Sequence, residues 1–197
     1  MASVVRVAKK ASKTAPKVIH PPYVRVHIKA GMASPAPPLG PQLGQRGINV
    51  AQFCEVFNQR TDQFETGTPI PCWITINPDR SFKLDISHPP IPWLILRAAG
   101  IARGAMNPRR EIAGKLSVKH VYEIAKLKSE DEIYTGMDLD KICRRVISFC
   151  HQCGIEVTKE DLDPVEYGKF LDERRTIVKD QLQEIQQLKA AKLTRVI

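Results

Sequence analysis

Long hydrophobic runs are missing from this 197-residue chain. A transmembrane helix needs about 20 consecutive, mostly apolar residues. The most apolar stretch covers residues 91–99, and it is interrupted by Pro92 and Arg97. The sequence therefore excludes a transmembrane protein, and we expect no membrane partner.

Paired cysteines and groups of catalytic side chains are also missing. Five cysteines without a regular spacing exclude a secreted disulfide scaffold and favour a reducing compartment. Cys150 and Cys153 form a C-x-x-C pair, but a zinc site would need a second pair, and a redox site would be expected near a βαβ unit. The histidines are scattered, with no evident nucleophile or pair of carboxylates. We expect no enzyme, no cofactor and no metal site.

Acidic residues are absent from the first 20 positions, which carry five basic residues. A basic, acid-free segment that contains Ser and Thr is typical of a mitochondrial transit segment. A basic tail that itself touches RNA is the alternative interpretation of this composition. Residues 1–17 are therefore predicted to be a basic extension of one of these two kinds.

A second basic zone lies inside the chain. Residues 86–122 hold six basic residues and one acid, whereas residues 21–85 hold six basic residues and five acids. A concentrated internal basic patch indicates a polyanionic partner such as nucleic acid. A solvated surface without a partner is the plainer alternative.

The first part of the chain predicts strands and one helix. Residues 23–29 alternate apolar and polar side chains, as in a half-buried strand. Asn49 and Gln52 have the spacing of a capping box, which predicts a helix that ends near Thr61. A β-hairpin is predicted over residues 70–76 and 81–86, around a turn at residues 77–80.

Proline and glycine gather at two places. Residues 30–47 are rich in both, which predicts a stiff, shaped loop because proline fixes φ and glycine permits sharp reversals. Three prolines fall within residues 88–92 and predict an extended hinge. We therefore place an α+β domain at residues 18–87 and the hinge at residues 88–93.

Helical patterns dominate beyond the hinge, and residues 94–157 predict a compact, mostly helical domain. Its helices are expected at residues 93–101, after Ser117 and at residues 139–153. A basic loop is expected at residues 103–114 and a short strand at residues 155–157. The fold class is thus α+β, with a small N-terminal α+β domain, a proline hinge and a mostly helical C-terminal domain.

A helical extension is predicted at residues 158–197. Asp163, Pro164 and Glu166 have the spacing of a helix start. The extension carries no net charge, so its apolar face is expected to pack on a protein surface rather than on RNA. That face is formed by Leu171, Val178, Leu182, Ile185 and Leu188.

The proline-glycine segment resembles a known family signature. The motif SPAPPLGPQLGQ at residues 34–45, followed by Gly47-Ile48-Asn49, is similar to that of the large-subunit ribosomal protein family conventionally numbered eleven. Matching residues continue in order to about residue 157. The terminal extensions resemble those of the mitochondrial form. The resemblance implies a protein of the mitochondrial matrix, within the mitochondrial ribosome.

The resemblance also implies a site and partners. Family members dock on a folded segment of large-subunit ribosomal RNA at the stalk base, next to stalk proteins. Their proline face looks toward translational GTPases and thiopeptide antibiotics. Here that face corresponds to Pro35, Pro37, Pro38 and Pro41.

The predicted RNA contacts combine charge, close approach and hydrogen bonding. Folded RNA is recognised largely by its shape through phosphate and 2′-hydroxyl contacts, which suits basic, small and hydroxyl-bearing residues. The C-terminal candidates are Arg97, Gly100, Arg103, Gly104, Asn107, Arg109, Arg110, Gly114, Lys115, Ser117 and Lys119. Ser148 and His151 are added from the last helix of the domain, although bulky Phe149 departs from the family pattern there. An adaptor that binds protein through its C-terminal helix is the alternative function, with the basic residues serving solubility or import.

Overall fold

The computed structural model describes residues 21–77 and 79–194. The predicted basic extension at residues 1–17 lies outside the described residues. Within the described part of the chain, no helix is long and apolar enough to cross a membrane. Two clusters of buried side chains, one before and one after the predicted hinge, form the cores.

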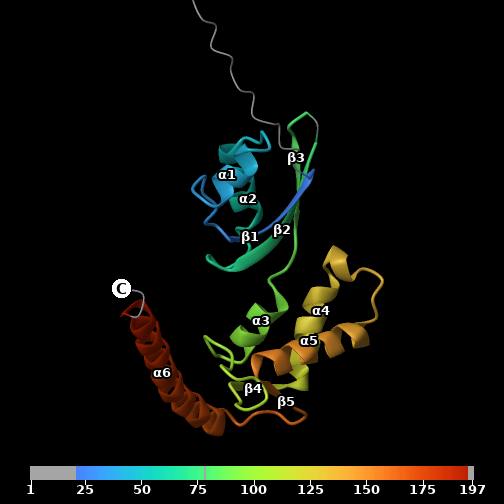
Figure 1. Cartoon of the computed structure of the whole chain (residues 1–197). Helices are drawn as coiled ribbons and strands as arrows, with labels where there is room; N and C mark the ends of the chain where they lie inside the picture. Colours follow the sequence, from blue (N-terminus) through green and yellow to red (C-terminus); the bar gives the residue numbers. More distant parts are fainter. Residues whose placement is uncertain (1–20, 78, 195–197) are drawn as a thin grey trace, which may run out of the picture.

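The N-terminal core lies between a sheet and two helices. The antiparallel sheet has the order β1-β2-β3, with Val26 opposite Cys72 and Ile74 opposite Leu84. Alternate side chains of this sheet are buried together with Phe53 of helix α2, as expected for a sheet with one covered face. The elements are β1 (Tyr23–Lys29), α1 (Leu39–Gly44), α2 (Val50–Arg60), β2 (Pro69–Ile76) and β3 (Phe82–Ile86) (Figure 1).

Helix α2 starts as its sequence predicts. The side chain of Asn49 accepts a hydrogen bond from the backbone N–H of Gln52 at 3.4 Å. This bond satisfies one of the free donors at the helix start. The hairpin between β2 and β3 also forms as predicted, although Pro78 of its turn is outside the described residues.

The proline-glycine segment contains a short helix that the sequence analysis did not predict. Helix α1 tolerates Pro41 because the first turn of a helix does not need the N–H that proline lacks. Leu39 and Leu43 lie one turn apart and are both buried, which fixes α1 to the core. A Cβ at Gly40 would lie 2.2 Å from the carbonyl oxygen of Pro35, so this turn requires glycine.

The C-terminal core combines helices with a small sheet. Helix α3 begins at Ile91, inside the predicted hinge, because Pro92 is accommodated in its first turn. Strand β4 was predicted as loop and helix cap, but it pairs in parallel with β5. The partner strand β5 forms where the short strand was predicted, whereas β4 lies between a loop signal and a helix cap that hide it. The elements are α3 (Ile91–Ala98), β4 (Gly114–Ser117), α4 (Val118–Ser129), the 3-10 helix η1 (Glu132–Tyr134), α5 (Leu139–Cys153) and β5 (Ile155–Thr158).

A buried ion pair holds the hinge. Lys128 and Asp131 pair at the end of α4 and are 5% and 4% exposed. The Lys128 ammonium also donates to the carbonyl oxygens of His88 at 3.1 Å and Pro89 at 3.3 Å. Asp131 accepts a hydrogen bond from the His88 backbone N–H at 2.8 Å. We call these three partners, Lys128, Asp131 and the backbone of residues 88–89, the hinge clamp.

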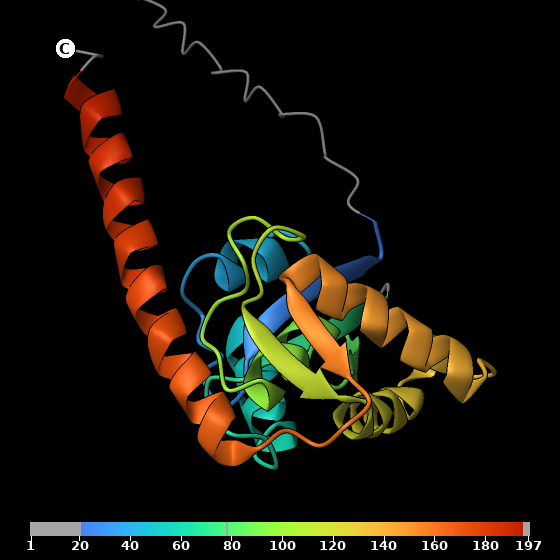
Figure 2. The ribbon, with the colours of Figure 1, turned by 90° about the horizontal axis from the view of Figure 1, so that it is seen from below.

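Helix α6 (Pro164–Thr194) lies within the predicted extension and begins at the predicted helix start. It leaves the C-terminal domain as a single rod (Figures 1 and 2). Leu171 and Val178 are half-buried, whereas Leu182 is 44% and Leu188 is 61% exposed. Ile185 is also half-buried, so the predicted apolar face is partly covered, with Leu182 and Leu188 left exposed.

Candidate RNA-binding surface

The basic loop is built around one acidic residue. It ends at residue 113 because β4 begins at Gly114. The carboxylate of Glu111 accepts hydrogen bonds from the backbone N–H groups of Met106 and of Asn107, the latter at 3.1 Å. Arg109, between them and Glu111, adopts a left-handed conformation with φ of 77°. Such a backbone is unfavourable for a side-chain-bearing residue, so the surrounding hydrogen bonds must hold the turn.

The loop is packed tightly against the end of α5. The backbone N–H of Ala105 donates to the carbonyl oxygen of Cys153 at 2.9 Å, and that of Ala113 donates to Gly154 at 2.7 Å. A Cβ at Gly104 would lie 2.9 Å from the Cys153 oxygen. Close approach at Gly104 therefore serves protein packing, which differs from the predicted backbone contact with RNA.

A shallow groove brings part of the predicted set together. Arg109 from the basic loop lies beside Ser148 and His151 from α5, so residues far apart in the sequence share one surface. All three are exposed. The remaining lining residues are Pro108, Arg144, Ile147 and Gln152. Asn107 and Arg110 are exposed on the same loop, and we group them with the groove residues under the name loop–α5 surface.

Other predicted cations lie elsewhere and already have partners. Arg97 pairs with Glu65 of the N-terminal domain at 2.6 Å and stacks over Trp93. Lys119 pairs with Asp161 at 2.6 Å. Exposed pairs of this kind are weak and can be exchanged for a phosphate.

The rest of the predicted set is distributed around the domain. Gly100 is exposed beside Arg97, and Arg103 is half-buried at the start of the basic loop. Lys115 is half-buried, 3.7 Å from Glu156 and over the ring of Phe170. None of these three lines the groove beside α5.

Two predicted contact residues are buried instead. A Cβ at Gly114 would lie 3.2 Å from side-chain atoms of Ala99 and Ile101, so this glycine allows packing inside the domain. Ser117 is 2% exposed, and its hydroxyl pairs with Nδ1 of His120 at 2.9 Å. Burial removes Gly114 and Ser117 from the surface that RNA can reach.

Sequence reasoning missed two contributors. Arg144 comes four residues before Ser148, and His151 comes three residues after it. This helical spacing places all three on one face of the helix, and it could have identified Arg144. Glu111 appeared only as the single acid of a basic zone. Its structural role depends on Arg174, which no local pattern connects to it.

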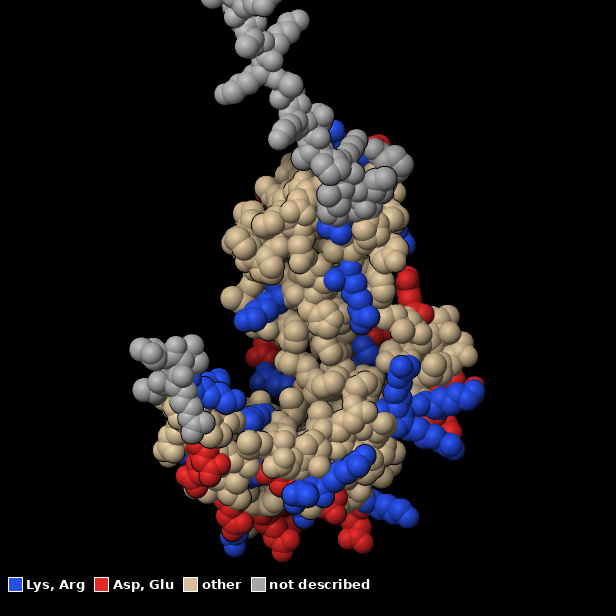
Figure 3. Space-filling model, viewed as in Figure 1, with Lys and Arg blue, Asp and Glu red and all other residues tan. Residues whose placement is uncertain are grey.

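Figure 3 shows Lys and Arg side chains on both halves of the displayed face, with more of them on the C-terminal half. Asp and Glu side chains lie among them, mainly on the C-terminal half. The two signs of charge are therefore mixed on this face.

The predicted proline edge is accessible. Pro35, Pro37, Pro38 and Pro41 are all exposed, while Leu39 between them is buried. The peptide bond between Pro37 and Pro38 is cis. The segment thus presents rigid prolines on a base anchored in the core.

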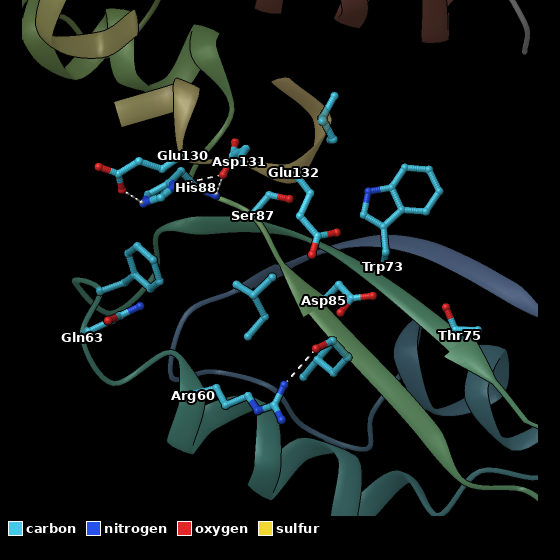
Figure 4. A pocket seen from close by; sticks show the side chains of 14 residues that line it. Arg60, Gln63, Trp73, Thr75, Asp85, Ser87, His88, Glu130, Asp131 and Glu132 are labelled. Atoms are coloured by element: carbon cyan, nitrogen blue, oxygen red, sulfur yellow. Dashed lines mark hydrogen bonds and ion pairs between the residues drawn. The ribbon is translucent and has the colours of Figure 1, made fainter. Parts of the chain in front are cut away.

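A cleft runs along the hinge, between the sheet and the end of α4. Figure 4 shows His88, Glu130 and Asp131 on one side, with Trp73 and Asp85 on the other. Arg60 donates to the carbonyl oxygen of Leu84 at 2.8 Å and closes one end. Because both halves of the chain line it, its shape depends on the hinge.

In the C-x-x-C pair, Cys150 is buried and Cys153 is half-buried. Burial raises the pKa of the Cys150 thiol to about 12 and also raises the pKa of Cys153. Raised thiol pKa values disfavour the thiolate form that a redox nucleophile needs. Among residues 21–77 and 79–194, no group of three or more His, Cys, Asp or Glu side chains could hold a metal ion.

Comparison with known proteins gives two consecutive family matches. Residues 24–82 match ribosomal protein L11, N-terminal domain, and residues 87–157 match ribosomal protein L11, RNA binding domain. The loop–α5 surface lies within the second match.

Full-length relatives extend the match into the termini. The chain is 51% identical to large ribosomal subunit protein uL11m of Caenorhabditis elegans, over 91% of each chain. It is 45% identical to that of Drosophila melanogaster, over 95% of each. It is also 42% identical to that of Schizosaccharomyces pombe, over 68% of this chain and 93% of the relative. The chain therefore belongs to the ribosomal protein L11 family, in its mitochondrial form.

Proposed function

We propose that the loop–α5 surface carries the contact with large-subunit ribosomal RNA and that the exposed proline edge serves translational GTPases. As a member of its family, the chain is a non-enzymatic structural component of the large subunit of the mitochondrial ribosome and binds ribosomal RNA. The finer division of labour is our proposal. It includes the domain boundaries 18–87, 88–93, 94–157 and 158–197.

One observation carries the RNA assignment. Arg109, Arg144, Ser148 and His151 line one shallow groove, in which Arg144 also forms an exposed ion pair with Asp140 at 3.0 Å. Arginine binds phosphate through parallel hydrogen bonds, while hydroxyl and imidazole groups suit 2′-hydroxyl contacts. Gly104 and Ala105, both half-buried, pack against the end of α5 and support this surface.

The proline edge supports the second part of the proposal. Its four prolines are exposed on a segment fixed by Leu39 and Leu43, so it presents a stiff surface with little conformational entropy to lose on binding. The groove beside α5 belongs to the other domain. RNA and a GTPase could therefore be engaged at the same time, next to neighbouring stalk proteins.

A salt titration of RNA binding tests the assignment. Replacing Arg109 and Arg110 with Ala in the full chain should weaken binding to a stalk-base transcript. It should also flatten the dependence of log K on log salt by roughly one unit for each lost phosphate contact. Arg25→Ala with Lys83→Ala, which removes two charges from the N-terminal sheet, is the matched control.

The two pairs of variants give opposite outcomes for the two functions. An RNA contact at the basic loop predicts a change for the Arg109 and Arg110 pair alone. Equal effects from both pairs would show a nonspecific role of charge. Binding that does not respond to salt would favour the protein-adaptor alternative.

A further inference from the structure

We infer that helix α6 braces the basic loop and that Arg174 is a positioning residue for RNA recognition. The inference rests on the proposed function of that loop. It gives the C-terminal extension a role in RNA binding even though the extension carries no net charge.

A shared carboxylate links the helix to the loop. Arg174 donates from Nη1 to Glu111 Oε2 at 3.1 Å, and Gln181 donates from Nε2 to the same oxygen at 2.8 Å. The other oxygen of Glu111 accepts the backbone N–H groups of Met106 and Asn107. One side chain thus connects two turns of α6 to the turn that presents Arg109.

Arg174 is buried in this contact. It is 6% exposed, and a buried guanidinium is unfavourable unless it is paired. Its Nε and Nη2 atoms are buried without a hydrogen-bond partner in the part of the chain that the structure describes, so Glu111 supplies its counter-charge. Arg175, the next residue, is exposed and pairs with Asp172 on the same helix.

Further contacts fix α6 at both ends of the loop. The hydroxyl of Tyr167 donates to the carbonyl oxygen of Ala99 at 2.7 Å, before the loop, and accepts the N–H of Lys115 at 3.3 Å, after it. Leu171 lies beside Gly100. Figure 2 shows the helix running past the loop that leads from α3 to β4.

The consequence is preorganisation rather than added charge. The loop has no helix or strand of its own between residues 103 and 113. A loop that is ordered before RNA arrives loses less conformational entropy on binding. Because Arg174 is buried, it offers RNA no phosphate contact, and its effect must pass through Glu111.

The test compares Arg174→Met with Arg175→Met in the full chain. Both variants remove one positive charge from adjacent positions. Arg174→Met should weaken binding to the stalk-base transcript by about tenfold, while Arg175→Met stays within about twofold. Amide exchange at Met106 and Asn107 should speed up in Arg174→Met alone. The salt slope should match wild type in both, since neither variant loses a phosphate contact.

A second pair of variants guards against misfolding of Arg174→Met. Gln181→Ala removes one bond to Glu111 from a half-buried position, and Gln183→Ala changes an exposed neighbour. Weaker binding and faster exchange for Gln181→Ala alone support the inference. Equal binding within each pair, or faster exchange with unchanged affinity, overturns it. If wild type itself lacks salt-dependent binding to the transcript, the proposed function fails instead.

Discussion

Glu111 has an unusual environment for a carboxylate in a basic zone. The hydrogen bond from Arg174 is the main reason that its pKa falls from 4.5 to about 2, with further hydrogen bonds from Asn107, Gln181 and Met106. Its ionised form is therefore favoured by folding. Its contribution to stability is complete above about pH 4.5 and is lost as the pH falls through about 2.

This linkage predicts a pH-dependent difference between wild type and Glu111→Gln. At neutral pH, Glu111→Gln should lower the free energy of unfolding by about 1–3 kcal/mol, because a buried Arg174 loses its counter-charge. The difference should shrink as the pH is lowered from about 4.5 toward 2. Urea unfolding across this range measures it. A difference that stays constant over the range would contradict the assigned pKa.

Glutamate at position 65 provides the control. Glu65→Gln also removes a carboxylate paired with an arginine, but both partners are exposed. Exposed pairs contribute about 0–1 kcal/mol. Its effect should be small at every pH.

Among the elements, the end of α5 depends on one glycine. Gly154 caps the helix in the left-handed conformation, with φ of 72°. A Cβ there would lie 2.3 Å from Cβ of Ala105 and 3.1 Å from the carbonyl oxygen of Glu111. The same residue thus ends the helix and leaves room for the basic loop.

Gly154→Ala should therefore be costly. The left-handed backbone costs roughly 1–2 kcal/mol for a non-glycine residue, and overpacking adds about 1–3 kcal/mol. Gly136→Ala is the matched control, since Gly136 also has a positive φ of 79° but nothing lies within 4 Å of its added Cβ. Thermal unfolding should show a clearly larger loss for Gly154→Ala. Similar losses would mean that the loop moves away without cost.

The proline edge is the second element with a specific prediction. Replacing Pro37 and Pro38 should leave incorporation into the ribosome intact and impair factor-dependent GTP turnover or thiopeptide sensitivity. The reason is that both residues are exposed, away from the groove beside α5. Subunit composition and GTP hydrolysis on assembled ribosomes measure the two effects. Unchanged turnover and sensitivity would reduce the segment to a structural loop, and lost incorporation would indicate a folding defect.

Predictability from the sequence differed between elements for physical reasons. The helix after Asn49 and the strand at Tyr23–Lys29 carry local signals, a cap and an alternation, and both formed as predicted. Strand β4 depends on pairing with a segment about 40 residues away, which no local pattern records. The groove was partly predictable, because Arg109, Ser148 and His151 were chosen. The contact between Glu111 and α6 was not.

At the scale of the whole molecule, the hinge clamp fixes the path of the chain where it enters the C-terminal domain. It ties residues 88–89 to α4 through a buried ion pair. Removing one partner of such a pair leaves an uncompensated buried charge, which costs about 3–5 kcal/mol.

Asp131→Asn should therefore destabilise the C-terminal domain and broaden the distribution of distances between the two domains. Lys128→Met combined with Asp131→Asn should recover much of the stability, since the buried charge is gone, but not the hinge geometry, because the bonds from Lys128 to His88 and Pro89 are lost. Thermal unfolding and distance measurements between labels on α2 and α4 separate the two effects. Recovery of both would show that the clamp does not set the hinge.

The hinge clamp also determines where the N-terminal domain can move relative to the C-terminal domain. It holds His88 from the side of the C-terminal domain, whereas the N–H of Ser87 donates to the carbonyl oxygen of Pro71 in the N-terminal sheet, so the two domains meet between Ser87 and His88. Helix α1, in the proline-glycine segment, lies at the end of the N-terminal domain that is far from the hinge (Figure 1). Besides the hinge, the exposed ion pair between Arg97 and Glu65 links the two domains, and exposed pairs of this kind are weak. A rotation at the hinge would therefore displace the prolines further than residues close to His88, without moving the C-terminal domain.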